Sequence, residues 1–168
     1  MSPIKTALSF RSLNNVHEEL NKLFVRHQIL LMHREIRGVL DIIHELQEKY
    51  SLHIHDEESL LLPVYGRRVD PVPQGGAVEF YIQEHKKIEQ FLKRFIAAVS
   101  DWQQKGLCTP LRLVKLFDQH YTFNDLLNHH HAREDTFLYR LLDRVLNTEE
   151  KQALIQKISI LPKDKRSR

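Results

Sequence analysis

One ionisable pair occupies positions where a helix should carry apolar side chains. Between residues 39 and 64, apolar side chains recur alternately four and three residues apart, the pattern of a helix with one buried face. His53 and Glu57 fall on that face, in the series Val39, Ile43, Leu46, Tyr50, His53, Glu57, Leu60 and Val64. A carboxylate is costly to bury without a partner. Taken alone, the pair is explained by a His–Glu hydrogen bond in a helical core.

The same pair recurs in the second half of the chain. His130 and Glu134 lie on a second apolar face, formed by Leu116, Phe123, Leu127, His130, Glu134, Phe137 and Leu141. Two such pairs on two helices of one chain are harder to explain as isolated hydrogen bonds. Together they offer two imidazoles and two carboxylates, which suit iron, manganese or zinc. The sequence therefore predicts a metal centre inside a helical core.

Composition limits the class of protein. With 168 residues, 42% of them hydrophobic and 28% charged, the chain can form one globular domain with a core. It has no apolar run of about 18 residues and no signal-peptide pattern, so we expect a cytoplasmic protein without a membrane span. Its single cysteine, Cys108, excludes an intramolecular disulfide framework and a thiolate metal cage. A net charge of +3 without a basic, aromatic-interleaved stripe does not predict nucleic-acid binding.

Periodicity and breakers predict an all-α fold. We expect a lead-in over residues 1–12, a helical bundle over 13–145, and a short helix with a basic tail over 146–168. Ser12 is the expected N-cap of the first helix, and Gly38 the expected turn after it. The predicted helices span residues 13–35, 39–66, 78–102, 111–145 and 148–159, with a Pro/Gly-rich loop over 67–76 and Pro162 after the last helix. Short connections predict an up-down-up-down four-helix bundle.

The remaining metal ligands should come from the first and third helices. His85 takes a core position on the third, and its midpoint with His130 falls at about residue 107, beside the breaker Gly106. On the first helix, pairing with His53 puts the turn near residue 35 for His17 and near residue 40 for His27. His17 is preferred, because residues 17–24 parallel residues 85–92 and suggest an internal duplication. His27 stays open as the alternative.

The other histidines fall outside this pattern. His120 lies on the fourth helical stripe and is expected either beside the site or packed in the core. The register of His131 faces away from the core, so its pairing with Asp135 is not preferred. Surface positions are expected for His44, His55, His129 and His131.

These motifs resemble the hemerythrin-like, or HHE cation-binding, domain family. The resemblance covers about residues 13–145 and rests on His17, His53-x-x-x-Glu57-Glu58 with Leu62-Pro63, Glu84-His85 and His130-x-x-x-Glu134. It implies a four-helix bundle with a non-heme di-iron centre and an oxo or hydroxo bridge, although another divalent metal is possible. The implied metal ligands are His17, His53, Glu57, His85, His130 and Glu134, with the two glutamates as bridges.

The chain also departs from the oxygen-carrying hemerythrins. They have a second histidine four residues after the one on the third helix, where this chain has Glu89, and they use His-x-x-x-x-Asp on the last helix. The spacing of His130 and Asp135 fits that motif too, so the last-helix carboxylate is either Glu134 or Asp135. The departures point to the wider HHE group.

Four functions are compatible with this site. We expect a binding protein that engages dioxygen, nitric oxide or peroxide for sensing, storage or protection. Iron donation or repair of iron–sulfur centres is an alternative, but residues 1–12 carry no cysteine. An enzyme is less favoured, because no separate acid–base constellation is visible. A metal-free helical adaptor would leave six aligned ligand residues as a coincidence.

Overall fold

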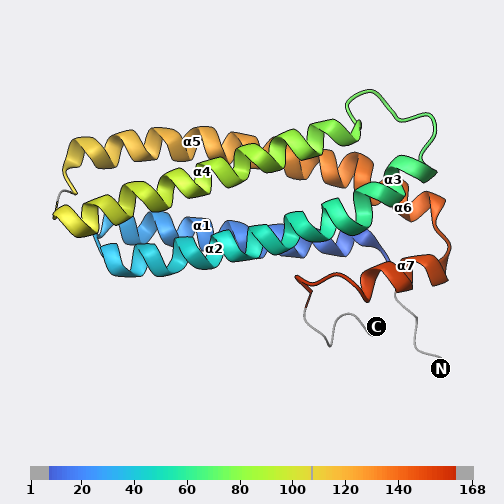
Figure 1. Cartoon of the computed structure of the whole chain (residues 1–168), viewed down its shortest axis with the longest axis horizontal. Coiled ribbons are helices and arrows are strands. Elements are labelled where there is room, and N and C mark those ends of the chain that lie inside the picture. The colour runs from blue at the N-terminus through green and yellow to red at the C-terminus, as the bar shows by residue number, and fades with distance from the viewer. Residues whose placement is uncertain (1–7, 107, 162–168) are drawn as a thin grey trace.

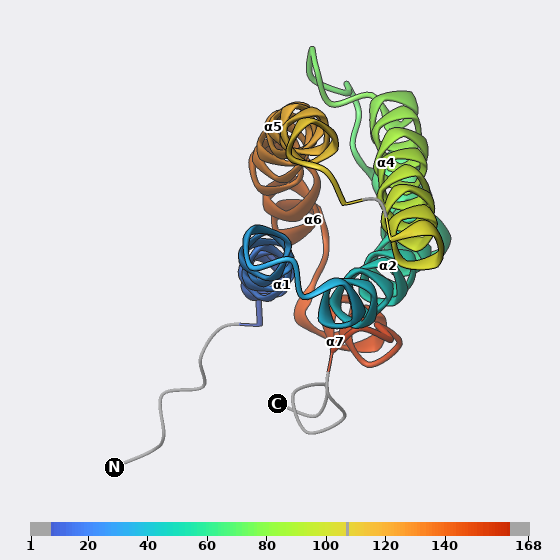
Figure 2. The same ribbon diagram turned by 90° about the vertical axis from the view of Figure 1, so that its left-hand side faces the viewer.

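The computed structural model describes residues 8–106 and 108–161, and in these ranges the chain contains helices but no strands. Four long helices lie side by side along the molecule (Figure 1). They are α1 (Asn14–Met32), α2 (Ile36–Asp56), α4 (Val78–Lys105) and α5 (Pro110–Arg133). In the end view of Figure 2 they enclose a common interior. That interior is filled by buried aliphatic and aromatic side chains, including Phe24, Tyr50, Phe95 and Phe123.

Two of the long helices change their winding at the predicted carboxylates. A π-helical segment, Glu57–Leu61, follows α2 and leads into α3 (Leu62–Arg68). A second π-helical segment, Glu134–Tyr139, follows α5 and leads into α6 (Arg140–Val145). The predicted helices over 39–66 and 111–145 are thus each a single rod with a π-helical insertion. Short π-helical insertions often mark functional sites.

The first turn is not where the sequence predicted it. The chain turns at residues 33–35, and Gly38 lies inside α2. Arg34 takes the left-handed conformation, with a φ of 57°, and its N–H donates to the Leu31 carbonyl at 3.0 Å. The turn was missed because glycine or asparagine normally takes this conformation. By contrast, Gly106 does end α4 in the left-handed region, with a φ of 63°, and Pro110 does open α5.

The start of the described chain is ordered against α6. Phe10–Leu13 forms a 3₁₀ turn, where the sequence suggested a loose lead-in. The side chain of Ser9 caps this turn, and Leu13 occupies the N-cap of α1, so Ser12 is not the cap. Asp143 accepts hydrogen bonds from the Ser9 hydroxyl at 2.5 Å and from the Phe10 N–H at 3.1 Å. Residues 1–7 of the expected lead-in lie outside the described residues.

The last helix, α7 (Thr148–Ile155), starts at Asn147 with a capping box and ends four residues earlier than predicted. After it the chain returns to α2, where the Ile160 N–H donates to the buried carboxylate of Asp56 at 2.8 Å. Pro162 and the basic tail lie outside the described residues. Among the described helices, none is both long enough and apolar enough to cross a membrane.

Candidate metal centre

Four long helices each bring one imidazole to a common point in the interior. His17 comes from α1, His53 from α2, His85 from α4 and His130 from α5. His17 is 6% exposed, and the other three are exposed by 1% or less. The rings form two pairs, with centroids 5.0 Å apart for His17 and His53 and 4.8 Å apart for His85 and His130.

Glu57 lies between these two pairs. Its Oε1 is 4.0 Å from Nε2 of His53, and its Oε2 is 3.2 Å from Nε2 of His85. The two oxygens of one carboxylate therefore face different histidine pairs.

Glu134 repeats this arrangement from the opposite side of the interior. Its Oε1 is 2.7 Å from Nε2 of His130, and its Oε2 is 3.0 Å from Nε2 of His17. Each glutamate thus has the geometry of a bridge between two imidazole pairs.

Several polar atoms of the site lie close together but form no hydrogen bonds with one another. Glu57 Oε2, His85 Nε2, His130 Nε2 and both oxygens of Glu134 are buried and, among the described residues, make no hydrogen bond. The distances between these atoms would allow hydrogen bonds, so the bonds are missing because their angles are unsuitable. The Nε2 atoms of His17 and His53 face each other at 3.3 Å, and two ligands of one ion at about 2.1 Å lie about 3.0–3.4 Å apart. The donor set fits a metal cation better than it fits a hydrogen-bonded core.

The remote ring nitrogens of one pair are held by carboxylates. Nδ1 of His85 lies 2.9 Å from Oε1 of Glu58, and Nδ1 of His130 lies 3.1 Å from Oε2 of Glu84. Arg133 contacts the same Glu84 carboxylate at 3.0 Å. A carboxylate at Nδ1 fixes the ring so that Nε2 presents its lone pair, as in most metal-binding histidines. In the sequence, Glu58 and Glu84 stood out only as parts of the family motifs, and Glu84 had no assigned role.

Comparison with known protein families supports the same chemistry. A family model, the hemerythrin HHE cation binding domain, matches residues 76–160, half of the chain. The chain belongs to this family. Searches of curated proteins and of solved structures gave no significant match.

The hemerythrin HHE match contains His85, His130 and Glu134. His17, His53 and Glu57 precede the matched residues, but the structure places them in the same buried cluster. Two overlapping groups of closely spaced ligand atoms occur here among the described residues: His53, Glu57, His130 and Glu134, and then His17, His131 and Glu134.

The structure also separates the alternatives that the sequence left open. His17 lies in the cluster, whereas His27 packs elsewhere, beside His120. Glu134 lies in the cluster, whereas Asp135 pairs with Arg11 at 2.9 Å near the surface. As ligands of a bound metal, all six residues remain predictions.

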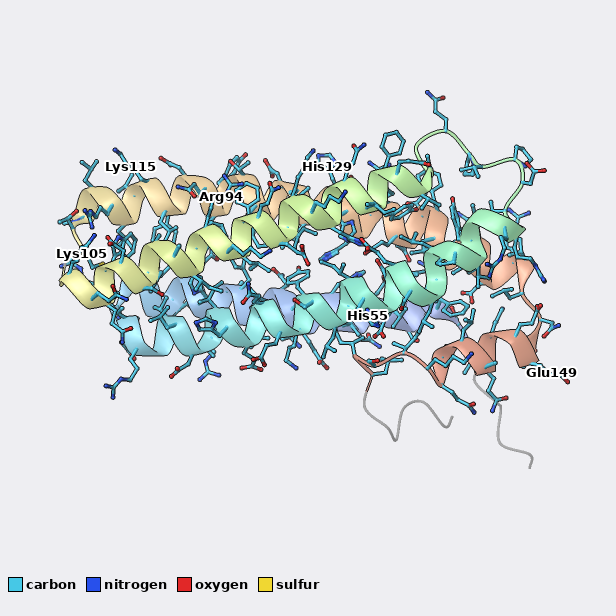
Figure 3. The ribbon with its side chains drawn as sticks, viewed as in Figure 1. His55, Arg94, Lys105, Lys115, His129 and Glu149 are labelled. Atoms are coloured by element: carbon cyan, nitrogen blue, oxygen red, sulfur yellow. The ribbon has the colours of Figure 1, made fainter. Side chains whose placement is uncertain are left out.

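Two neighbours of the hemerythrin HHE centre were not predicted. Tyr139 donates its hydroxyl to Oε1 of Glu57 at 2.7 Å and lies 3.3 Å from Nε2 of His17. His131, expected at the surface, stacks on His17 with ring centroids 3.9 Å apart. The surface prediction for His131 is therefore wrong. His44, His55 and His129 are exposed as expected, and Figure 3 labels His55 and His129.

The local charges explain the protonation of this cluster. Burial alone would raise the pKa of Glu134, but His130 and His17 outweigh burial and hold it well below its usual range. Burial likewise opposes charge on His130, yet the nearby Glu134 and Glu84 raise its pKa to about 10. Desolvation raises the pKa of Tyr139 well above its usual value, so its hydroxyl stays a donor. A cation that bound here would have to displace protons from imidazoles.

Proposed function

We propose that this chain holds two iron ions between α1, α2, α4 and α5, arranged as an up-down-up-down four-helix bundle, and uses them to engage dioxygen or a related small molecule. The observation that carries the proposal is the orientation of Glu57 and Glu134. Each has one oxygen beside the pair His17 and His53 and the other beside the pair His85 and His130, and Oε1 of Glu134, next to His130, also lies 3.6 Å from Nε2 of His53. Imidazole and carboxylate ligands in this ratio suit iron.

The chain itself performs three tasks at this centre. The two glutamates would neutralise charge and bridge the ions, while Glu58 and Glu84 orient two of the imidazoles. The bundle interior excludes water, because every proposed ligand is at least nine-tenths buried. When bound, an iron pair supplies redox chemistry toward dioxygen, nitric oxide or peroxide.

Tyr139 gives this centre a hydrogen-bond donor. Its hydroxyl contacts both Glu57 and His17, which belong to different proposed ligand types. It can hold a proton at the edge of the centre, where a small polar molecule would gain a partner. This arrangement supports binding or sensing of a small molecule as the role of the centre.

The test is metal analysis of protein purified without a histidine tag, together with its absorption spectrum. We expect about two irons per chain and the bands of a bridged ferric pair. His17→Ala should lose much of the bound iron, and the matched control His27→Ala should not. Protein that stays metal-free after anaerobic iron loading would contradict the proposal and favour a metal-free adaptor.

A further inference from the structure

A second pair of buried imidazoles lies away from the proposed iron centre. His27 on α1 and His120 on α5 are each ten residues from His17 and His130, which is about 15 Å along a helix. Their exposed fractions are 0% and 1%. Their ring centroids are 5.2 Å apart, and the ring planes are inclined by 59°.

Three nitrogens of this pair are unsatisfied. Nε2 of His27 and both nitrogens of His120 are buried and have no hydrogen-bond partner among the residues that the structure describes. Leaving a buried polar group without a partner costs about 1–3 kcal/mol. Leucine or phenylalanine normally occupies such core positions. We therefore look for a function that explains the two histidines.

The hydrogen bond of His27 fixes its tautomer in the form that can bind a cation. Its Nδ1 lies 3.4 Å from the carbonyl of Val39, which can only accept, so the proton resides on Nδ1. Nε2 of His27 consequently carries a lone pair. A backbone carbonyl at the remote nitrogen is a common support of metal-binding histidines.

Both imidazoles are neutral at pH 7. Burial lowers the pKa of His27 to about 4, and burial together with the nearby His27 lowers the pKa of His120 to about 3. Aromatic rings surround His120, with centroids 4.6 Å away for Phe95 and 5.1 Å away for Phe24. Protons therefore do not compete for the lone pairs near neutral pH.

A groove at the surface extends to one member of the pair, His120. It lies between α1 and α5 and has a volume of about 450 Å³. Three amide side chains line it, those of Asn21, Gln28 and Asn124. An ion could enter by this route, and water or amide oxygen could complete its coordination.

We propose that His27 and His120 form a separate site for one zinc-like divalent cation. Two imidazoles bound at about 2.0–2.1 Å to a tetrahedral ion have ring centres about 5 Å apart, close to the observed spacing. Among the described residues no carboxylate contacts either ring, so the protein ligands nearest to the proposed ion are imidazole nitrogens. Such a site favours zinc or copper over iron, calcium or magnesium. This proposal does not depend on the iron centre.

The experiment adds Zn²⁺ to the iron-loaded protein, removes loosely bound ions, and measures zinc and iron in each sample. Wild type is compared with His120→Leu and with the matched control His129→Leu, which removes an exposed histidine from the same helix. We expect wild type and the control to retain one zinc more than His120→Leu, with equal iron in all three. X-ray absorption of the zinc should show two imidazole ligands.

Equal zinc in wild type and His120→Leu would overturn the proposal, as would zinc gained only by displacing iron. His27→Leu provides a second, independent variant and should lose the same single zinc. Both leucine variants should fold, because each replaces a buried imidazole that has at least one unsatisfied nitrogen with an apolar side chain. If no variant binds iron, the zinc difference between wild type and His120→Leu still tests this site, so the two proposals fail separately.

Discussion

At the scale of single residues, the two halves of the candidate metal centre have different hydrogen-bond partners. His85 and His130 have carboxylates at their Nδ1 atoms, from Glu58 and Glu84. Within the described part of the chain, no carboxylate contacts Nδ1 of His17 or His53, and Tyr139 and His131 adjoin that half instead. The half with anchored imidazoles should bind metal more tightly.

Glu84→Gln tests this support. The substitution weakens the acceptor at Nδ1 of His130 and removes the ionic partner of Arg133. We expect metal affinity to fall by about 10- to 100-fold, measured by competition with a chromophoric chelator. Glu79→Gln, an exposed change of equal charge on the same helix, should leave the affinity unaltered, and equal affinities in all three proteins would remove Glu84 from the site.

Two buried tyrosines allow a paired test of the Glu57 contact. Tyr139 donates to Glu57, whereas the Tyr50 hydroxyl has no hydrogen-bond partner among the described residues. Without metal, Tyr139→Phe should lower the free energy of unfolding by about 1.5–3 kcal/mol, the range for a hydrogen bond to a charged group. Tyr50→Phe should be neutral or stabilising. Urea denaturation measures both, and an equal loss in the two variants would show that the Tyr139–Glu57 bond contributes nothing.

The sequence indicated five of the six proposed ligands because they interrupt apolar stripes of helical period, and it indicated His17 because residues 17–24 parallel residues 85–92. It could not identify Tyr139, which lies five residues after Glu134 and should face away from it on an α-helix. In the π-helical segment Glu134–Tyr139 the backbone bonds span five residues, so residues five apart lie nearly above one another. The change of winding, which no residue type signals here, brings Tyr139 to the site.

At the scale of helices, the pattern predicted the order of the elements better than their ends. The four stripes gave the four long helices, and Gly106 with Pro110 gave the second hairpin turn. The first turn was placed at Gly38, because that glycine is the only strong breaker in the region. The left-handed Arg34 that makes the turn carries no such signal.

Gly38→Ala distinguishes the two positions of this turn. A Cβ at residue 38 would meet Cδ1 of Leu30 at 3.4 Å, an ordinary van der Waals contact. Because Gly38 lies inside α2, alanine should raise the free energy of unfolding by up to about 1 kcal/mol, seen as a higher denaturation midpoint. A loss of stability would instead indicate a turn at Gly38.

At the scale of the whole molecule, the buried histidine pair makes stability sensitive to acid. The folded-state pKa values of His27 and His120, about 4 and about 3, lie below the usual 6.5. Between these values and pH 6.5 the unfolded chain binds protons that the folded chain does not. Their contribution to stability is therefore complete above pH 6.5 and is lost as the pH falls.

The double variant His27→Leu/His120→Leu isolates this effect. Below pH 6, each histidine that is protonated only in the unfolded chain should cost metal-free wild type about 1.4 kcal/mol of unfolding free energy per pH unit, relative to the variant. Denaturation at pH 7, 6 and 5 measures the difference. Other titrating groups, including His130 and His131, are common to both proteins and cancel. Parallel profiles would show that the pair binds protons equally in the folded and unfolded states, so that burial does not lower its pKa values.

Because the proposed ligands come from four different helices, bound metal would affect how the protein unfolds. Four imidazoles from four helices would be tied through two ions and two carboxylates, in a chain whose single cysteine forms no intramolecular disulfide. Such a centre acts as a cross-link between the hairpins α1–α2 and α4–α5. Either hairpin could separate from the other only after a metal–ligand bond breaks, so the loaded protein would unfold in one step. Without the ions, the hairpins would be held together by side-chain packing and by hydrogen bonds such as those of Glu58 with His85 and of Tyr139 with Glu57.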